Sequence, residues 1–288
     1  MKTYNDLYLN ARNLLRKLGV EAFSLEARIL VADAAGKSVS QLLRDLNRYA
    51  TPAVEDKLTD SLARRMKGEP VAYITGSWEF YGIPIQVTPD VLIPRMDTEL
   101  LVDTAKSLLL GRKMDARILD LCTGSGCIAC ALAREFPAAR LVAVDISASA
   151  LEVCRKNIAA CGLDSRCIVR QADAAASPPL GMGSFDMIVS NPPYIAAPDI
   201  MTLDASVRDY EPIWALDGGK DGLRFYRSIL KYWKSLLRPG GFLLFEVGED
   251  QAETVRELML SAGFAAADTR KDTGGTERVV LGKMYDKM

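Results

Sequence analysis

From residue 94 onwards, short apolar runs alternate with longer amphipathic runs, and this alternation constrains the fold more than any other feature of the chain. The short runs have the length of buried strands, and the longer ones have helical spacing. Strands that alternate with helices form a parallel sheet with both faces covered. We therefore expect an α/β domain whose parallel strands are Arg117–Leu121, Arg140–Asp145, Arg166–Gln171, Phe185–Ser190 and Gly241–Val247.

The end of the chain breaks the alternation. Two strand-like runs, Phe264–Thr269 and Glu277–Met284, follow each other with only a Gly-rich turn at Gly274-Gly275 between them. Two strands joined by a short turn pair antiparallel. The sheet should therefore close with a terminal antiparallel hairpin. The helices expected in this domain are Ile128–Phe136, Ala148–Cys161, Leu223–Leu237 and Asp250–Ala262.

The first 67 residues predict a small helical bundle. Thr3 with Asp6 has the pattern of a capping box, Ser24 and Ser38 mark further helix starts, and Thr51-Pro52 puts proline at the first helical position of a fourth helix. A bundle of this kind serves packing or partner recognition, because none of its residues form a catalytic pattern.

Glycine and proline punctuate residues 68–93, between β-like runs such as Val71–Thr75 and Ile83–Val87. This pattern of β-like runs separated by glycine and proline predicts a β-hairpin linker. The expected organisation is a helical bundle over 1–67, a hairpin linker over 68–93 and a catalytic domain over 94–288.

Composition excludes several classes of function. The chain has no histidine, which removes Ser-His-Asp triads, His-ligated zinc and histidine pH switches. The formal net charge is −1, so no nucleic-acid partner is indicated by charge. No apolar run reaches the ~20 residues of a membrane span, and the N-terminus lacks the pattern of a signal peptide. We expect a cytoplasmic protein with no membrane partner.

The first motif with chemical content is the segment Asp120-Leu-Cys-Thr-Gly-Ser-Gly126, between an apolar strand and a helix. Glycine allows a tight turn and a close ligand, and the helix N-terminus presents free N–H groups. The same segment contains Cys122, which with Cys127 and Cys130 matches part of an iron–sulfur spacing. We favour packing of small residues behind the loop, and expect no metal.

Two acidic residues follow the next two strands. Asp145 lies 19 residues after Gly126, where an acid accepts the ribose hydroxyls of a nucleoside; the alternative is a cap for the helix that follows. Asp173 ends the third strand, where it either accepts from an adenine amino group or caps a turn. The loop and Asp145 are typical of both nicotinamide-dependent oxidoreductases and nucleoside-dependent methyltransferases, so they do not separate these two classes.

The segment Ser190-Asn-Pro-Pro-Tyr-Ile195 separates these classes. Two prolines hold a rigid extended turn. The side-chain carbonyl of Asn191 and the backbone carbonyl of Pro192 are suited to accept both hydrogens of a planar –NH2 group, and Tyr194 offers a flat face or a hydroxyl beside it. Such a group is a poor nucleophile, so positioning and electrostatics are the available catalysis. The hypothesis of an oxidoreductase gives no role to this turn. A non-catalytic adaptor would not need the turn to be intact.

When this turn is taken together with several other segments of the sequence, the chain resembles the peptide chain release factor glutamine methyltransferases (the PrmC/HemK family). The resemblance covers nearly the whole chain, from the helical region to Glu277-Arg-Val-Val280. One segment that carries it is the turn Asn191–Tyr194, hereafter the acceptor turn. The others are Gly68–Gly76, Leu92–Arg95 with Thr98-Glu99, Ala215–Gly222 with Tyr226-Arg227, and Glu246–Gly248 with Asp250-Gln251.

The resemblance implies a class I S-adenosylmethionine-dependent methyltransferase with a Rossmann-like sheet. It implies methyl transfer to the side-chain amide nitrogen of the glutamine in the Gly-Gly-Gln motif of class-1 release factors, with the helical region helping to dock the factor. Carried over by position, the cofactor's methionine end lies on the loop and the substrate amide on the acceptor turn. The residues implied are Cys122, Thr123, Gly124, Ser125, Gly126, Asp145, Asp173 and Asn191 for the cofactor, and Asn191, Pro192, Pro193 and Tyr194 for the substrate, with Asn191, Pro192 and Tyr194 catalytic.

Three positions depart from the family pattern. Cys122 stands where glycine is common, Pro94-Arg-Met-Asp-Thr-Glu99 lacks a second proline, and Ala174 stands where an aromatic residue is common after the third acid. The last of these weakens the expectation of adenine stacking at that position. A methyltransferase acting on an adenine-type base of a nucleic acid is the alternative, since an exocyclic amine poses the same chemical problem.

Overall fold

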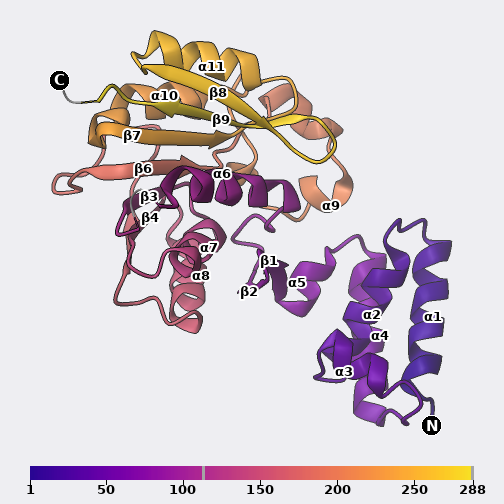
Figure 1. Cartoon of the computed structure of the whole chain (residues 1–288). Coiled ribbons are helices and arrows are strands. Elements are labelled where there is room, and N and C mark those ends of the chain that lie inside the picture. Colours follow the sequence, from indigo (N-terminus) through magenta and orange to yellow (C-terminus); the bar gives the residue numbers. More distant parts are fainter. Residues whose placement is uncertain (112–113, 287–288) are drawn as a thin grey trace. The chain divides into compact units, whose positions relative to one another are not determined.

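The computed structural model describes residues 1–111 and 114–286. Its contacts divide the chain into two compact units. One unit contains Met1–Ser77 and Asp204–Tyr210, and the other contains Trp78–Leu203 and Glu211–Met288 (Figure 1). A short segment from the second half of the chain therefore belongs with the N-terminal helices.

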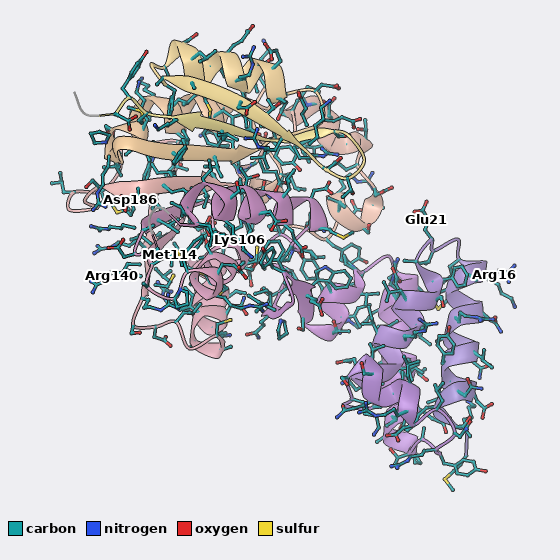
Figure 2. All side chains as sticks on the ribbon, viewed as in Figure 1. Arg16, Glu21, Lys106, Met114, Arg140 and Asp186 are labelled. Carbon is teal, nitrogen blue, oxygen red and sulfur yellow. The ribbon has the colours of Figure 1, made fainter. Side chains whose placement is uncertain are left out.

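The first unit, hereafter the helical unit, has its own apolar core of Leu, Val, Ile and Ala side chains. Its helices are α1 (Tyr4–Lys17), α2 (Phe23–Ala34), α3 (Val39–Arg44), α4 (Pro52–Met66), α5 (Val71–Thr75) and α9 (Ala205–Arg208). Charged side chains such as Arg16 and Glu21 stand exposed on its outside (Figure 2).

Most of the expected helix starts are confirmed. Thr3 and Asp6 form a reciprocal capping box, Ser38 forms another, and Pro52 occupies the first position of α4. The exception is Ser24: α2 begins one residue earlier, and no side chain caps it. The Ser24 hydroxyl instead lies 2.9 Å from the Tyr8 hydroxyl, so it links two helices.

The prediction of a strand at Val71–Thr75 is wrong, because this segment forms α5. The Pro70 carbonyl accepts the first helical hydrogen bonds, and Gly76, at φ +71°, ends the helix in the left-handed conformation. Four of its five residues are buried. Packing on α2 and α4 outweighs the small helix penalty of β-branched residues. By contacts, the helical unit extends to Ser77 rather than to 67.

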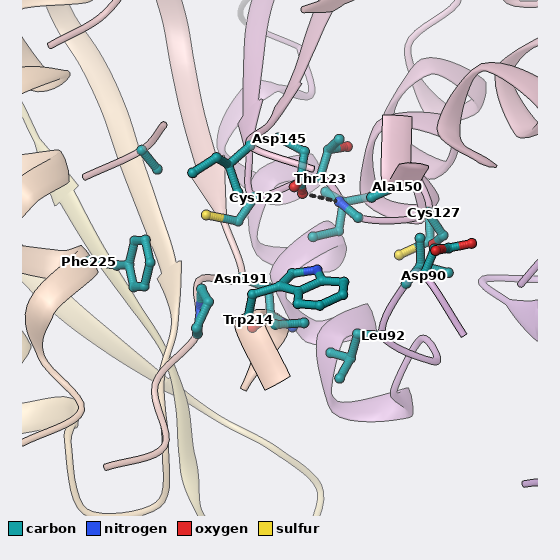
Figure 3. A pocket seen from close by; sticks show the side chains of 18 of the residues that line it. Asp90, Leu92, Cys122, Thr123, Cys127, Asp145, Ala150, Asn191, Trp214 and Phe225 are labelled. Carbon is teal, nitrogen blue, oxygen red and sulfur yellow. Dashed lines mark hydrogen bonds between the residues drawn. The ribbon is translucent and has the colours of Figure 1, made fainter. Parts of the chain in front are cut away.

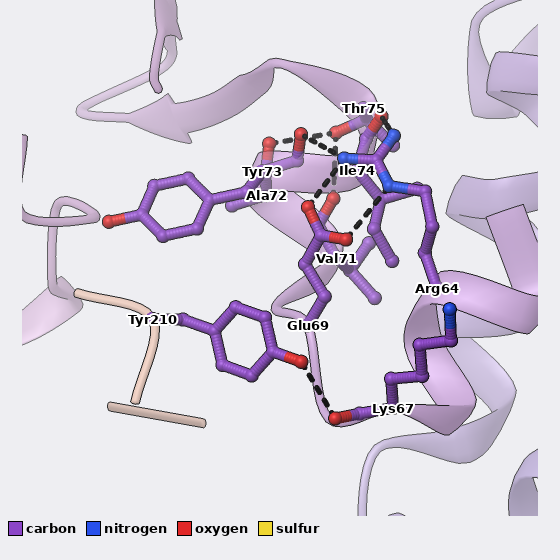
Figure 4. Close-up of polar contacts among 9 residues, drawn as sticks. All are labelled: Arg64, Lys67, Glu69, Val71, Ala72, Tyr73, Ile74, Thr75 and Tyr210. Carbon is purple, nitrogen blue, oxygen red and sulfur yellow. Dashed lines mark hydrogen bonds and ion pairs between the residues drawn. The ribbon is translucent and has the colours of Figure 1, made fainter. Parts of the chain in front are cut away.

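An ion pair links the end of α4 to the residues before α5, and a tyrosine links the Asp204–Tyr210 segment to the same residues (Figure 4). The Arg64 guanidinium donates to Glu69 at 2.8 Å and reaches carbonyl groups of α5. In the Asp204–Tyr210 segment, the Tyr210 hydroxyl donates to the Lys67 carbonyl at 2.7 Å. Residues 67–69 thus contact both the arginine that reaches α5 and the later segment.

The second unit, hereafter the catalytic unit, contains a seven-stranded sheet in the order β5-β4-β3-β6-β7-β9-β8. The five strands from β5 to β7 are parallel, and β9 and β8 run antiparallel at one edge. The predicted sheet and terminal hairpin are confirmed. The strands are β3 (Arg117–Leu121), β4 (Arg140–Asp145), β5 (Cys167–Gln171), β6 (Phe185–Ser190), β7 (Leu237–Glu246), β8 (Ala266–Lys271) and β9 (Glu277–Lys283).

Helices cover both faces of this sheet, with α10 and α11 on one face and α6, α7 and α8 on the other (Figure 1). Alternate residues of the strands, such as Leu119 and Leu121, face the α10–α11 side. The helix α6, which the sequence analysis did not single out, packs beside α7. The helices are α6 (Glu99–Leu109), α7 (Cys127–Glu135), α8 (Ala148–Ala160), α10 (Arg224–Tyr232) and α11 (Ala252–Ser261), with 3-10 turns at Met96–Thr98, Ala197–Thr202, Ile213–Ala215 and Lys234–Leu236.

A β-hairpin is present, formed by β1 (Ser77–Phe80) and β2 (Ile83–Gln86), and from Trp78 onwards it belongs by contacts to the catalytic unit. Tyr81 and Gly82 connect the strands, and both have positive φ, as in the two-residue turns that match strand twist. Tyr81 is held in this conformation by Glu99, which accepts from its backbone N–H at 2.7 Å. No helix in the described part of the chain is long and apolar enough to cross a membrane.

Candidate active site

Strand register brings the two predicted motifs together at one edge of the sheet. In β3 and β6, Leu121 pairs with Ser190, and the Ser190 hydroxyl donates to the Leu121 carbonyl at 2.8 Å. The next residues of the two strands, Cys122 and Asn191, therefore begin neighbouring loops. The chain order reverses between β3 and β6, and ligands of parallel sheets bind at the carboxyl ends of strands where this reversal occurs.

A pocket of about 340 Å³ opens at this position, within the size range of small-molecule sites. It is lined by both loops and by residues from six other parts of the catalytic unit (Figure 3). Of the predicted site residues, the lining includes Cys122, Thr123, Gly124, Ser125, Asp145, Asp173, Asn191 and Pro193. Gly126, Pro192 and Tyr194 belong to the same loops but do not line it.

The glycine loop turns through three residues with positive φ: Cys122 (+59°), Gly124 (+52°) and Gly126 (+81°). Gly126 precedes α7, and a Cβ there would lie 2.7 Å from the buried Cys154 sulfur, so only glycine fits without movement. At Gly124 an added Cβ would meet no atom of the described residues within 4 Å. The backbone at Gly124 is therefore open to a ligand in the pocket.

Cys122 is the non-glycine residue of this loop in the left-handed conformation, which costs an ordinary side chain about 1–3 kcal/mol. The small thiol packs beside the core below the sheet edge, and burial raises its pKa well above the ordinary value. A thiol of this kind stays neutral and unreactive. The sequence expectation that a cysteine fits where glycine is common is met geometrically, at the cost of backbone strain.

Asp120 fixes the start of the loop from below. It is fully buried, and one carboxyl oxygen accepts from the Thr123 hydroxyl at 2.6 Å. Burial raises the pKa of Asp120 to about 7. The cysteines behind the loop, Cys127 and Cys130, are buried and free. Among residues 1–111 and 114–286, no group of three acidic, cysteine or histidine side chains is arranged to hold a metal.

Asp145 lies across the pocket from the acceptor turn, at the end of β4. Its carboxylate accepts from the backbone N–H of Gly124 and of Ser147, each at 2.9 Å. Burial raises its pKa, while these two bonds act in the opposite direction. The cap of α8 is Ser147, whose hydroxyl accepts from Ala150. A carboxylate has about four acceptor positions, so acceptor capacity remains for a ligand hydroxyl.

We propose that Asp145 holds the ribose, and predict that Asp145→Ala weakens S-adenosylmethionine binding about 10- to 100-fold. The reason is the loss of hydrogen bonds to a charged group, worth about 1.5–3 kcal/mol. Isothermal titration of the cofactor checks this value. An unchanged Kd would remove Asp145 from the cofactor site.

Asp173 and two aromatic residues also line the pocket. One Asp173 oxygen accepts from the backbone N–H of Ala175 at 2.7 Å, so it closes a turn and also lines the pocket. Ala174 is buried in the core. The aromatic lining comes instead from Phe225 on α10 and from Trp214, which is 51% exposed. The sequence analysis missed both, since nothing in their local sequence marks them.

The acceptor turn is held from behind by residues of the later motifs. Gln251 donates to the Tyr194 carbonyl at 2.8 Å and accepts from the Gly248 N–H at 3.0 Å. The Tyr226 hydroxyl donates to the Glu246 carbonyl at 2.9 Å. Burial raises the pKa of Tyr194 above its ordinary range, so its phenol stays protonated. These contacts explain why Glu246–Gly248, Gln251 and Tyr226 accompany the turn.

A buried ion pair holds the loop that carries Trp214. Glu211, which is 5% exposed, pairs with Arg95 and accepts from the Ile93 N–H at 3.2 Å. The segment around Leu92–Arg95 is thereby fixed to the residues that precede Trp214. Two stretches that the sequence shows far apart thus form one wall of the pocket.

Comparison with known proteins agrees with this architecture. A family model for the methyltransferase small domain matches residues 96–205, and one for the PrmC N-terminal domain matches residues 6–76. The catalytic domain of hMettl16, solved with an MAT2A 3′UTR hairpin, superposes with a TM-score of 0.59 at 18% identity, covering 80% of this chain and 84% of that one. A methyltransferase from Pyrococcus furiosus superposes with a TM-score of 0.51 at 19% identity, covering 79% of this chain and 99% of that one. Both show the fold.

The sheet, the glycine loop and the acceptor turn together define a class I methyltransferase that uses S-adenosylmethionine as methyl donor. The release factor glutamine methyltransferase of Geobacter sulfurreducens is 41% identical over 95% of this chain and 94% of that protein, and that of Burkholderia pseudomallei is 40% identical over 99% of each. The chain belongs to the release factor glutamine methyltransferase family.

Proposed function

We propose that this enzyme transfers a methyl group from S-adenosylmethionine to the side-chain amide nitrogen of the glutamine in the Gly-Gly-Gln motif of class-1 peptide chain release factors. The observation that carries the proposal is the placement of the Asn191–Tyr194 turn beside the glycine loop, on neighbouring strands and at the edge of one pocket. The names of relatives that match along nearly the whole chain favour this substrate over a nucleic-acid base.

The pocket fits the methyl donor on the evidence of its own residues. The open backbone at Gly124, the free N–H groups at the start of α7 and the remaining acceptor positions of Asp145 suit the methionine and ribose parts of this molecule. S-adenosylmethionine supplies an electrophilic methyl group on a positively charged sulfur. The carboxylate of Asp145 adds negative charge to this side of the pocket.

The acceptor turn orients the substrate amide, which is a poor nucleophile. In a primary amide, the nitrogen lone pair is delocalised into the carbonyl group. The Asn191 side-chain oxygen and the Pro192 backbone oxygen accept the two amide hydrogens and so set the direction of the nitrogen lone pair. Proline at 192 and 193 keeps the turn rigid, which reduces the entropy lost on reaching the reactive geometry. No dedicated base is needed, because the methylated amide nitrogen releases its proton to water.

The helical unit is proposed to dock the body of the release factor. It has its own core and contributes no residue to the pocket, and it corresponds to the part that matches the PrmC N-terminal domain. Docking through the helical unit would lower the KM for the intact factor without changing the chemical step.

The test is transfer of labelled methyl to a purified class-1 release factor, beside a Gly-Gly-Ala version of the factor, a short Gly-Gly-Gln peptide and a DNA control. We expect label on the intact factor, a similar kcat with a higher KM for the peptide, and no label on the other two. Label on DNA, or equal label on the Gly-Gly-Ala version, would overturn the proposed substrate. An equal KM for peptide and factor would remove the docking role of the helical unit.

A further inference from the structure

A buried carboxyl group lies behind the acceptor turn. Glu246 is the last residue of β7 and is 2% exposed. In β6 and β7, Ser190 pairs with Phe245, so the following residues, Asn191 and Glu246, are neighbours at the sheet edge. One Glu246 oxygen, Oε2, has no hydrogen-bond partner among the described residues. Burial of a carboxyl group with an unsatisfied oxygen lowers the stability of the folded state. Its position beside the acceptor turn therefore suggests a functional role.

Thr98 connects this carboxyl group to the pocket. It is 2% exposed, sits where a 3-10 turn passes into α6, and lines the pocket. Its hydroxyl oxygen accepts from Asn191 Nδ2 at 3.2 Å. Burial raises the pKa of Glu246 to about 7, and hydrogen bonding by the Thr98 and Asn191 side chains acts against this rise.

The donors and acceptors available on Glu246, Thr98 and Asn191 determine which group donates and which accepts in each hydrogen bond among them. A carboxylate can only accept, so the Thr98 hydroxyl must donate its single hydrogen to Glu246, and its lone pair is left to accept from Asn191. The group of Asn191 that faces Thr98 and Glu246 must then be its NH2, which is a donor only. The remaining group of that amide, the carbonyl oxygen, is directed away from the carboxylate.

We propose that Glu246 is a positioning residue: directly and through Thr98, its carboxylate holds the Asn191 amide with NH2 inward and the carbonyl oxygen available to the substrate amide. The inference rests on the proposed function, because it assigns the reason why Asn191 presents an acceptor. In the flipped orientation, Asn191 would present N–H groups to the substrate –NH2, and two donors would oppose each other.

The main test is Glu246→Gln, which keeps the shape and removes the obligatory acceptor. Because the new amide can donate toward Thr98, the direction of the cluster is no longer fixed. We expect kcat to fall about 10- to 100-fold, as for other misplaced catalytic groups, while the Kd for S-adenosylmethionine stays within about twofold. Thermal stability should be unchanged or higher, because a buried, partly unsatisfied charge is replaced by a neutral group. Lower activity at undiminished stability separates positioning from a structural role.

The pH profile gives a second readout. The required form is the carboxylate, so wild-type kcat should decline as the pH falls through about 7, where Glu246 gains a proton. The charged groups that act on Glu246 are Asp97 and Arg278, from the turn before α6 and from β9. The titratable groups of Tyr194, Tyr226 and Cys127 also interact with it, and burial keeps all three neutral. Asp120 also has a pKa of about 7, so the decisive comparison is between wild type and Glu246→Gln, which should lack this acidic limb.

A pair of threonine variants keeps the test independent of how Glu246→Gln folds. Thr98→Val removes the hydroxyl and should lower kcat about tenfold, whereas Thr98→Ser keeps it and should restore activity. Thr104→Val is the matched control, since Thr104 is similarly buried on α6 but does not line the pocket; its kcat should equal that of wild type.

Wild-type labelling of the release factor in the same assay secures the proposed function separately from this inference. The inference is overturned by a wild-type kcat in Glu246→Gln, by parallel losses of kcat and cofactor affinity, or by equal activity of Thr98→Val and Thr98→Ser.

Discussion

Replacing Asn191 by alanine should lower the rate of methyl transfer by about 30- to 1000-fold, equivalent to about 2–4 kcal/mol of transition-state stabilisation. The variant loses the side-chain carbonyl that we propose accepts from the substrate amide, while the glycine loop and Asp145 stay in place. Asn191 borders the pocket, and its side chain contacts only Thr98 and Glu246 by hydrogen bonds among the described residues, so its removal leaves the cofactor side of the pocket unchanged. We therefore expect the Kd for S-adenosylmethionine to change by less than threefold.

Single-turnover kinetics with saturating cofactor and release factor measure this effect, because they report the chemical step apart from product release. Asp145→Ala is the complementary variant, expected to lose cofactor affinity more than rate at saturation. If Asn191→Ala lost affinity and rate equally, the residue would belong to the cofactor site and not to the acceptor. A rate close to that of wild type would shift the acceptor role to the backbone of the turn.

The position of the site could be predicted from the sequence because strand ends in a parallel sheet share one edge. The pairing of Leu121 with Ser190 needs only the knowledge that β3 and β6 are neighbours. Given that, the loop after one strand and the turn after the other must meet. The pocket confirms that these two segments, with Asp145 and Asp173, come together.

Contacts between side chains distant in the sequence could not be predicted. Thr98 and Asn191 are joined by one hydrogen bond across 93 positions, and Arg95 and Glu211 by an ion pair across 116. Phe225 and Trp214 reach the pocket from segments whose direction is set by packing. Local residue patterns determine that α10 is a helix, but not which residue of the helix points into the pocket.

The helix α5 shows the opposite failure, where a local pattern misleads. Val71–Thr75 contains three β-branched residues between prolines and glycines, which favours a strand by propensity. Burial of nearly the whole segment in the helical unit decides for a helix. Tertiary packing commonly outweighs propensity in segments as short as five residues.

Gly222→Ala should have the second large effect, although Gly222 is remote in sequence from the turn. Gly222 has φ +72°, and a Cβ there would lie 2.3 Å from the Tyr194 carbonyl oxygen and 2.6 Å from the Gln251 amide nitrogen. The left-handed conformation costs about 1–3 kcal/mol for alanine, and overpacking adds a similar ~1–3 kcal/mol. The new methyl group also competes with the bond between Gln251 and Tyr194, which holds the acceptor turn.

Gly162→Ala separates these two contributions. Gly162 has a similar φ of +69° after α8, but an added Cβ would meet no atom of the described residues within 4 Å. Denaturant unfolding should show a loss of about 1–3 kcal/mol for Gly162→Ala, from strain alone, and a clearly larger loss for Gly222→Ala. The kcat of the folded Gly222 variant should also fall, because its clash displaces Tyr194 and the turn before it, whereas Gly162→Ala should keep the wild-type kcat. Equal losses of stability in the two variants, with both fully active, would show that the segment ending at Gly222 does not support the acceptor turn. The expected difference would instead explain why Ala215–Gly222 accompanies the turn in this chain: its glycines let a second backbone approach closely enough to brace the residues that we propose hold the substrate amide.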